Sequence, residues 1–137
     1  MTDETTLLAA HAKYGDALLS RPGVHAVGIG LKMRGGELTT ELAIVCLVEK
    51  KLDLSELDKI IATVELPPGA AITVIDHNST ILARNPDPEA WVGQVLPDTP
   101  VIQAAVAGVN DVQQLTGVDG IERLYAFRDV PNAHDTG

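Results

Sequence analysis

Reactive side chains gather most closely in the run Asp76-His77-Asn78-Ser79, which follows an apolar segment. A histidine beside an acid and a serine could form a nucleophilic hydrolytic site, because the imidazole can take the proton of the hydroxyl. Asp, Asn and Ser are also the residues that close turns by hydrogen bonding to their own backbone. The turn is the favoured interpretation, and a hydrolytic site in the His77 region is the alternative.

Other candidate motifs fail on their spacing. Asp135-Thr136-Gly137 matches the tripeptide of aspartic peptidases but has no apolar strands around it. The glycines between Gly28 and Gly36 lead into a strand and lack the Lys-Ser or Lys-Thr pair of a phosphate loop, so they match no nucleotide-binding motif. Histidines stand at positions 11, 25, 77 and 134 without metal-ligand spacing, and Cys46 is the single cysteine. We therefore expect no catalytic residue, no cofactor and no metal.

Charge and hydropathy exclude further classes of function. The 137 residues include ten Lys and Arg against nineteen Asp and Glu, which gives a net charge of −9. Without a basic stripe, a nucleic-acid interface is not expected. No apolar run approaches the roughly 20 residues of a membrane span, and the first six residues are too polar and acidic for a signal peptide. The sequence predicts a cytoplasmic protein, or part of an assembly built in the cytoplasm, with no nucleic-acid or membrane partner.

The segment Val24–Val48 is predicted to be the structural centre. Two apolar runs flank Arg34-Gly35-Gly36-Glu37, and a Gly-Gly pair supplies the positive φ angles that a tight hairpin needs. One face of the first strand is bulky, while the other is nearly bare at Gly28 and Gly30. Glycine in a strand permits close approach of another element, so we expect a helix over this face.

Further helices and strands are expected around the hairpin. Thr5–Ser20 carries large apolar residues at three- and four-residue spacing, which is typical of an amphipathic helix, and it is the candidate for covering the glycine face. Ile60–Leu66 and Ala71–Asp76 are predicted strands. Thr99-Pro100 predicts the start of a helix over Val101–Leu115.

These patterns predict an α+β fold, a small mixed or antiparallel sheet centred on a buried β-hairpin. An N-terminal helix and a second helix near residues 100–116 are expected to pack on that sheet. The predicted division places an α+β core in residues 1–84. Residues 85–137 follow as a proline-rich arm, a helix and a C-terminal tail, packed on the same domain or on neighbours.

The segment Asn85–Pro100 is the least regular part of the sequence. It holds four of the eight prolines, which oppose regular backbone pairing, and loops of this length inside a domain are often functional or docked. We expect an interface with protein partners or with further copies of the chain, formed by Trp91, Val92, Val95 and Leu96 together with Tyr125 and Phe127. The competing prediction is that Trp91 folds back onto the core of its own chain.

Three runs within Leu18–Asp76, namely PGVHAVGIG, GGELTTELAIVCLVEKKLDLSEL and AITVID, carry a family resemblance. This part of the chain resembles the small domain that precedes trypsin-like serine peptidase domains in many bacterial proteins. The Gly-Asp-Ser-Gly motif of the peptidase is missing, so the resemblance transfers no catalytic residue. It implies a module that can exist apart from an enzyme.

The function that the sequence favours is a non-enzymatic structural or interaction protein, a subunit or decoration component of a larger assembly. The alternatives are a regulatory module that acts with a trypsin-like peptidase and a small hydrolase that uses the His77 region. A pocket that joins His77 to Ser79 and an acid would favour the hydrolase. A His77 that only forms a turn would argue against it.

Overall fold

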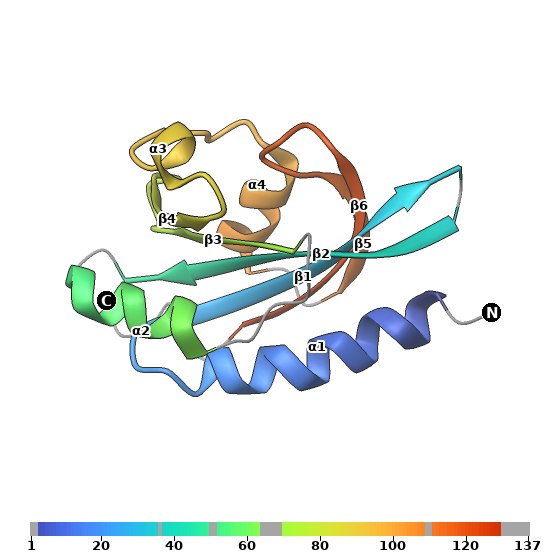
Figure 1. The fold of residues 1–137 in the computed structure, drawn as a ribbon, viewed down its shortest axis with the longest axis horizontal. Coiled ribbons are helices and arrows are strands. Elements are labelled where there is room, and N and C mark those ends of the chain that lie inside the picture. The colour runs from blue at the N-terminus through green and yellow to red at the C-terminus, as the bar shows by residue number, and fades with distance from the viewer. Residues whose placement is uncertain (1–2, 36, 50–51, 64–69, 109–110, 130–137) are drawn as a thin grey trace.

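The computed structural model describes residues 3–35, 37–49, 52–63, 70–108 and 111–129. These residues form a six-stranded sheet with helices on both faces (Figure 1). The strand order is β4-β3-β2-β1-β6-β5. The elements in chain order are α1 (Asp3–Leu19), β1 (Val24–Arg34), β2 (Glu37–Val48), α2 (Leu54–Thr63), β3 (Ala71–Ile75), β4 (Ile81–Asn85), α3 (Pro88–Trp91), α4 (Pro100–Ala107), β5 (Val112–Thr116) and β6 (Glu122–Asp129).

The sheet is mixed, as predicted. β2 and β3 run parallel, and every other neighbouring pair is antiparallel. The hairpin of β1 and β2 lies at its centre, with a register that runs from Val24 opposite Val48 to Arg34 opposite Glu37. Residues 42–48 of β2 are all buried, as expected for a strand that is covered on both faces. The predicted α+β fold centred on a buried hairpin is confirmed.

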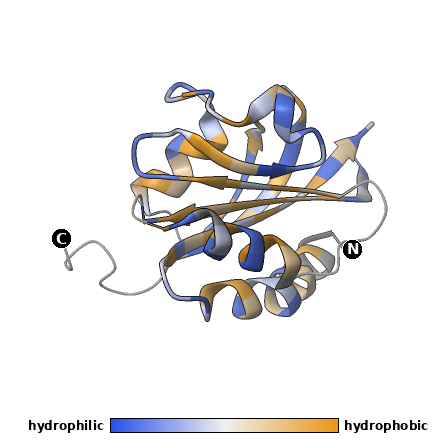
Figure 2. Ribbon diagram, turned by 60° about the vertical axis from the view of Figure 1, so that its left-hand side comes forward, coloured by the Kyte–Doolittle hydropathy of each residue, from blue (hydrophilic) through white to orange (hydrophobic). Residues whose placement is uncertain are grey.

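The lower face of the sheet in Figure 1 is covered by α1 and α2. Leu7 and Leu18 of α1 are fully buried in one cluster with Val27 and Ile29 of β1. In Figure 2 the central strands carry hydrophobic colours, while hydrophilic colours gather on the outer loops and helix surfaces. The predicted N-terminal helix is therefore present, but it packs on the bulky face of β1.

The glycine face of β1 is filled by aromatic rings from β6. A Cβ atom on Gly28 would lie 2.4 Å from Cε1 of Phe127, and one on Gly30 would lie 2.5 Å from Cε1 of Tyr125. The prediction that the helix Thr5–Ser20 covers this face is wrong, because the rings of the directly opposed residues reach over the bare backbone. Tyr125 and Phe127 are only 1% and 3% exposed, so the structure places both inside the core and not on the surface expected for interface residues.

Two predicted elements end differently in the structure. The first residues of the predicted strand Ile60–Leu66 form the end of α2 instead, where Ile60 is buried. Residues 64–69 lie outside the described residues. The helix expected near residues 100–116 ends at Ala107. Gly108 adopts a φ of 77° and donates its backbone N–H to the carbonyls of Ala104 and Ala105, which is a left-handed helix cap. Val112–Thr116 then forms β5.

Both parts of the predicted domain division contribute to one sheet. β6 pairs with β1 from Ala26 opposite Asp129 to Lys32 opposite Arg123, and β4 (Ile81–Asn85) crosses the expected boundary after residue 84. Residues 85–108 and 111–129 thus contribute strands to this sheet and helices that pack on it. The predicted tail, residues 130–137, lies outside the described residues.

The proline-rich segment folds back onto the start of β4. Ile81 donates its N–H to Gln94, Gly93 donates to Ile81, and Leu96 donates to Ser79. A β-bridge joins Thr80 to Val95. This pairing holds the short helix α3, with Trp91 at its end, over the face of the sheet that α4 also covers (Figure 1).

Candidate functional site

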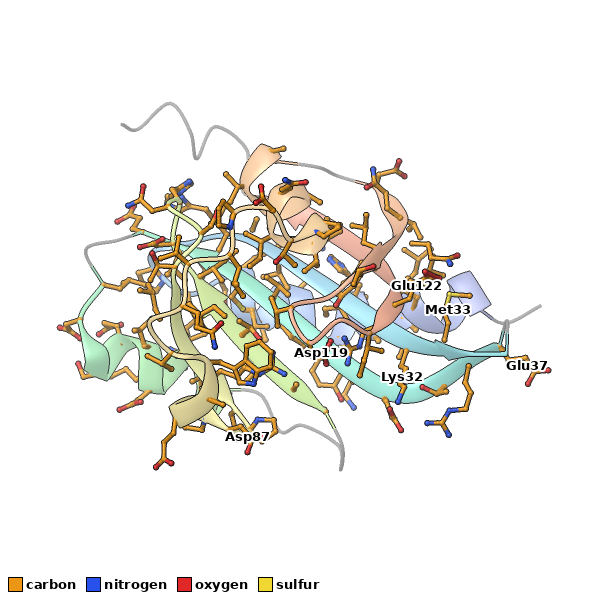
Figure 3. The ribbon with its side chains drawn as sticks, turned by 90° about the horizontal axis from the view of Figure 1, so that it is seen from above. Lys32, Met33, Glu37, Asp87, Asp119 and Glu122 are labelled. Atoms are coloured by element: carbon orange, nitrogen blue, oxygen red, sulfur yellow. The ribbon has the colours of Figure 1, made fainter. Side chains whose placement is uncertain are left out.

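A cluster of buried polar side chains lies on the upper face of the sheet, beneath α3, α4 and the turn between β5 and β6. Its surroundings are apolar, because Ile75, Ile81, Val101 and Ile102 are each fully buried on this side. Seen from above, Asp119 lies at the β5–β6 turn and Asp87 beside α3 (Figure 3). We call the group of Thr73, Arg84, Trp91, Asp119, Arg123 and Tyr125 the arginine cluster.

Arg84 is buried at the edge of the sheet next to Thr73, its partner in the register of β3 and β4. Its Nη1 donates a 2.7 Å hydrogen bond to Oγ1 of Thr73. The ring of Trp91 lies over the guanidinium, with 4.8 Å between the guanidinium carbon and the ring centroid. The buried Nε of Arg84 has no hydrogen-bond partner, and within the described part of the chain Arg84 takes part in no ion pair.

Arg123 on β6 is buried as well and is paired with a carboxylate, although its Nε, like that of Arg84, has no hydrogen-bond partner among the described residues. Its Nη1 and Nη2 donate two 2.9 Å hydrogen bonds to the two carboxylate oxygens of Asp119. The absence of a side chain at Gly117 makes room for this pair, because a Cβ atom there would lie 2.8 Å from both Nη1 of Arg123 and the hydroxyl of Tyr125. Such a two-pronged pair is the strongest arrangement available to a guanidinium and a carboxylate.

The two arginines differ in the sign of their pKa shifts. Burial lowers the pKa of Arg84, Arg123 lowers it further, and Asp119 opposes both without restoring it. Burial also disfavours the charge on Arg123, but the hydrogen bonds that Arg123 donates to Asp119 outweigh this effect of burial. The pKa of Arg123 is therefore raised. Because arginine keeps its proton in proteins, the lowered pKa of Arg84 marks a buried charge whose burial the nearby carboxylates of Asp119 and Asp87 offset only in part.

The arginine cluster is suited to binding rather than to catalysis. It combines two guanidinium groups with one carboxylate, and that carboxylate is already engaged by Arg123. Burial raises the pKa of the Tyr125 phenol, so this side chain stays neutral near pH 7. Across the described ranges, no group of three or more His, Cys, Asp and Glu side chains is arranged to hold a metal ion. A small anion is the ligand that this charge balance favours.

The Asp76-His77-Asn78-Ser79 run forms the turn between β3 and β4. Asp76 is buried, and its Oδ1 accepts hydrogen bonds from the backbone N–H groups of Asn78 and Thr80. Nε2 of His77 lies 3.0 Å from Nδ1 of His25 on β1. The favoured turn interpretation fits this geometry, and a hydrolytic triad does not, because the acid is committed to holding the turn.

The predicted interface residues separate into three groups. Val92 and Val95 are exposed, at 46% and 54%. Trp91 and Leu96 are partly buried against the core of their own chain, as the competing prediction expected for Trp91. Tyr125 and Phe127 lie fully within that core.

Sequence reasoning missed Arg84, Arg123 and Asp119. The available indication was arginine within two strand segments, Arg84 in Ile81–Asn85 and Arg123 in Glu122–Asp129, beside apolar residues. An arginine at an inward-facing strand position is unusual unless something pairs with it.

Comparison with known families identifies the chain. A family model described as a histidine kinase sensor domain, of the dCache_1-like type, matches residues 55–134, more than half of the sequence. The chain belongs to this family. The matched range of the sensor domain contains the whole arginine cluster. A search of curated proteins and a search of solved structures gave no match.

The family match overturns the resemblance to the domain that precedes trypsin-like peptidases. That resemblance covered Leu18–Asp76 and depended on the glycines, the apolar strand residues and the turn residues of the hairpin. In the structure these residues serve packing and chain reversal, which sheets of many families require, so they do not identify one family. In the part of the chain that the structure describes, no helix is long and apolar enough to cross a membrane.

Proposed function

We propose that this chain is a signal-sensing regulatory module that binds a small carboxylate against Arg84. The observation that carries the proposal is the buried guanidinium of Arg84, which forms no ion pair within the described residues, while the neighbouring Arg123 is paired with Asp119. Membership of the histidine kinase sensor domain family supports a regulatory role over a structural subunit. In this proposal the chain itself is not an enzyme, and a trypsin-like peptidase has no part in it.

The geometry of Arg84 favours a planar anion. Trp91 covers one face of the guanidinium, and Nη1 is occupied by Thr73. The side of the fork formed by Nε and Nη2 remains, and this edge matches the two oxygens of a carboxylate. A bound carboxylate would form the direct ion pair that neither Asp119 nor Asp87 forms with Arg84 in the described part of the chain.

The arm over Arg84 offers a route from binding to signalling. Trp91 lies on the guanidinium, and the segment that follows it turns back at Gly93, which adopts a φ of 93°. A ligand that reaches Arg84 has to displace the indole, and the exposed side chains of Val92 and Val95 move with it. We propose that these two valines present the signal to a protein partner or to a second copy of the chain.

The proposal is tested by a thermal-shift screen with small mono- and dicarboxylates, amino acids and inorganic phosphate. A carboxylate that binds should raise the melting temperature, because a ligand at one hundred times its Kd stabilises the fold by about 2.7 kcal/mol. Arg84→Met should abolish the shift. The matched control Arg34→Met, at the exposed hairpin end where Arg34 lies near Glu41, should retain it.

Two results would contradict the proposal. The first is a carboxylate that stabilises Arg84→Met as much as the wild type. The second is a screen in which no carboxylate shifts the melting temperature of the wild type, while its fold is intact by circular dichroism.

A further inference from the structure

A second polar cluster lies at the end of the sheet where β1 begins and β2 and β3 end. It joins three side chains in a row. Nε2 of His25 lies 3.1 Å from Oε1 of Glu49, and Nδ1 of His25 lies 3.0 Å from Nε2 of His77. The two imidazole rings are tilted by 56° with centroids 5.1 Å apart. The arginine cluster does not use any of these groups, and the family match does not assign them a role.

The backbone directs each ring toward the other. His25 is the extra residue of a β-bulge, because Val24 pairs with Val48 while Ala26 pairs with Leu47. A bulge redirects the side chain of its extra residue. His77 is presented by the β3–β4 turn, which the buried carboxylate of Asp76 holds through two backbone hydrogen bonds.

Hydrogen-bond chemistry fixes where the protons lie. A carboxylate can only accept, so Nε2 of His25 carries the proton in the bond to Glu49. In a neutral His25 ring Nδ1 is then bare, and it accepts the N–H of His77 Nε2. One proton therefore lies between the two rings. The hydrogen bond between His25 and His77 is kept when the pair of imidazoles gains a single positive charge, because the carboxylate of Glu49, bonded to His25, balances that charge.

We propose that His25 and His77 share one proton and form a latch that ties the beginning of β1 to the β3–β4 turn. The latch opens when both rings are protonated, because both facing nitrogens then carry hydrogen and two cations oppose each other. Among the described residues, the carboxylate of Glu49 is bonded to His25, and Asp76 is next to His77 in the chain. Acidification that adds a proton to each ring therefore releases the latch independently of any ligand at Arg84.

The test is a double-mutant cycle at two pH values. The melting temperatures of the wild type, His25→Gln, His77→Gln and the double variant are measured at pH 7.0 and pH 4.5. At pH 7.0 each single variant should melt about 3 °C below the wild type, and the double variant should melt no lower than the singles. At pH 4.5 the variants should melt at or above the wild type, because the repulsion is gone. Asp58→Asn, on the exposed side of α2, controls for the general effect of acid on an acidic chain.

The latch would be overturned if the two single substitutions lowered the melting temperature additively in the double variant and by the same amount at both pH values. If a variant fails to fold, the wild type still provides a test through long-range proton–nitrogen spectra of its imidazoles, recorded with EDTA at pH 7.5. The latch requires His25 with its proton on Nε2 and a bare Nδ1. The opposite tautomer would overturn it.

Discussion

Within the described residues, the face of the sheet under α1 and α2 buries aliphatic side chains and one imidazole, that of His11. The face under α3 and α4 buries aliphatic residues together with the guanidinium groups of Arg84 and Arg123. Both faces exclude water, but among the described residues the second contains a buried guanidinium, that of Arg84, which takes part in no ion pair. Burying such a charge costs stability, so a fold built for stability alone would resemble the first face.

This comparison teaches that the two faces have separate roles. The α1 and α2 face stabilises the hairpin through packing. An apolar side chain of similar volume can replace another at its buried positions. In the proposed function, the α3 and α4 face gives up part of that stability to keep the guanidinium of Arg84 buried and oriented for a ligand. The substitutions below test this division, beginning with the largest expected effect.

Truncation on the α1 face should give the largest loss. Leu18 is fully buried under the sheet, and Leu18→Ala should lower the free energy of unfolding by about 2–5 kcal/mol, because it removes packing and leaves a cavity. Urea denaturation measures this loss. Leu8→Ala, on the same helix but 51% exposed, is the control and should change stability by less than about 0.5 kcal/mol. Equal losses at the two positions would mean that α1 is not docked as described.

A smaller loss is expected on the glycine face. Gly28→Val should destabilise the fold by about 1–3 kcal/mol through overpacking against Phe127. Combining it with Phe127→Leu should restore part of this loss, because the smaller side chain leaves room for the new methyl groups. If α1 covered Gly28 instead, the second substitution would add its own cost and restore nothing.

The smallest effect concerns pH and the one imidazole on the α1 face. Burial lowers the pKa of His11, Arg128 lowers it further, and the carbonyl of Val27 and Asp16 oppose the shift. The unfolded chain therefore binds the proton more readily, so stability is fully present above about pH 6.5 and falls as the pH drops toward the folded-state pKa. His11→Leu should flatten this part of the curve of unfolding free energy against pH. If the unfolding free energy of His11→Leu has the same slope against pH as that of the wild type between pH 7 and pH 5, His11 does not contribute to the pH dependence of stability.

The hairpin and the N-terminal helix could be predicted from the sequence because each has a strong local pattern. Alternation along Val24–Val48 and helical spacing along Thr5–Ser20 are properties of neighbouring residues, and both elements are present. The neighbour of the glycine face could not be predicted, because it depends on the pairing of β1 with β6 across about a hundred residues. The second helix was predicted too long because Gly108, a strong stop, lies within an otherwise apolar run.

The candidate site could not be predicted from the sequence, because it too depends on residues that are far apart in the chain. Arg84 and Arg123 come from strands at positions far apart in the sequence, and Asp119 approaches Arg123 only because Gly117 leaves space beside it. The motif that stood out, Asp76-His77-Asn78-Ser79, forms a turn. Local patterns therefore predicted the supporting elements, while the charge balance of the arginine cluster needed the three-dimensional structure.

Arg84 is a buried charge that forms no ion pair within the described residues, and we propose that it is kept for an anionic ligand. The most direct test of this central claim is the free energy of unfolding of Arg84→Met beside that of the wild type, in a buffer free of carboxylate, phosphate and sulfate. Methionine keeps much of the apolar stem and removes the charge, so the account predicts a variant at least as stable as the wild type. A loss of about 2 kcal/mol or more would contradict it, because Arg84 would then act as a structural partner of Thr73 and Trp91.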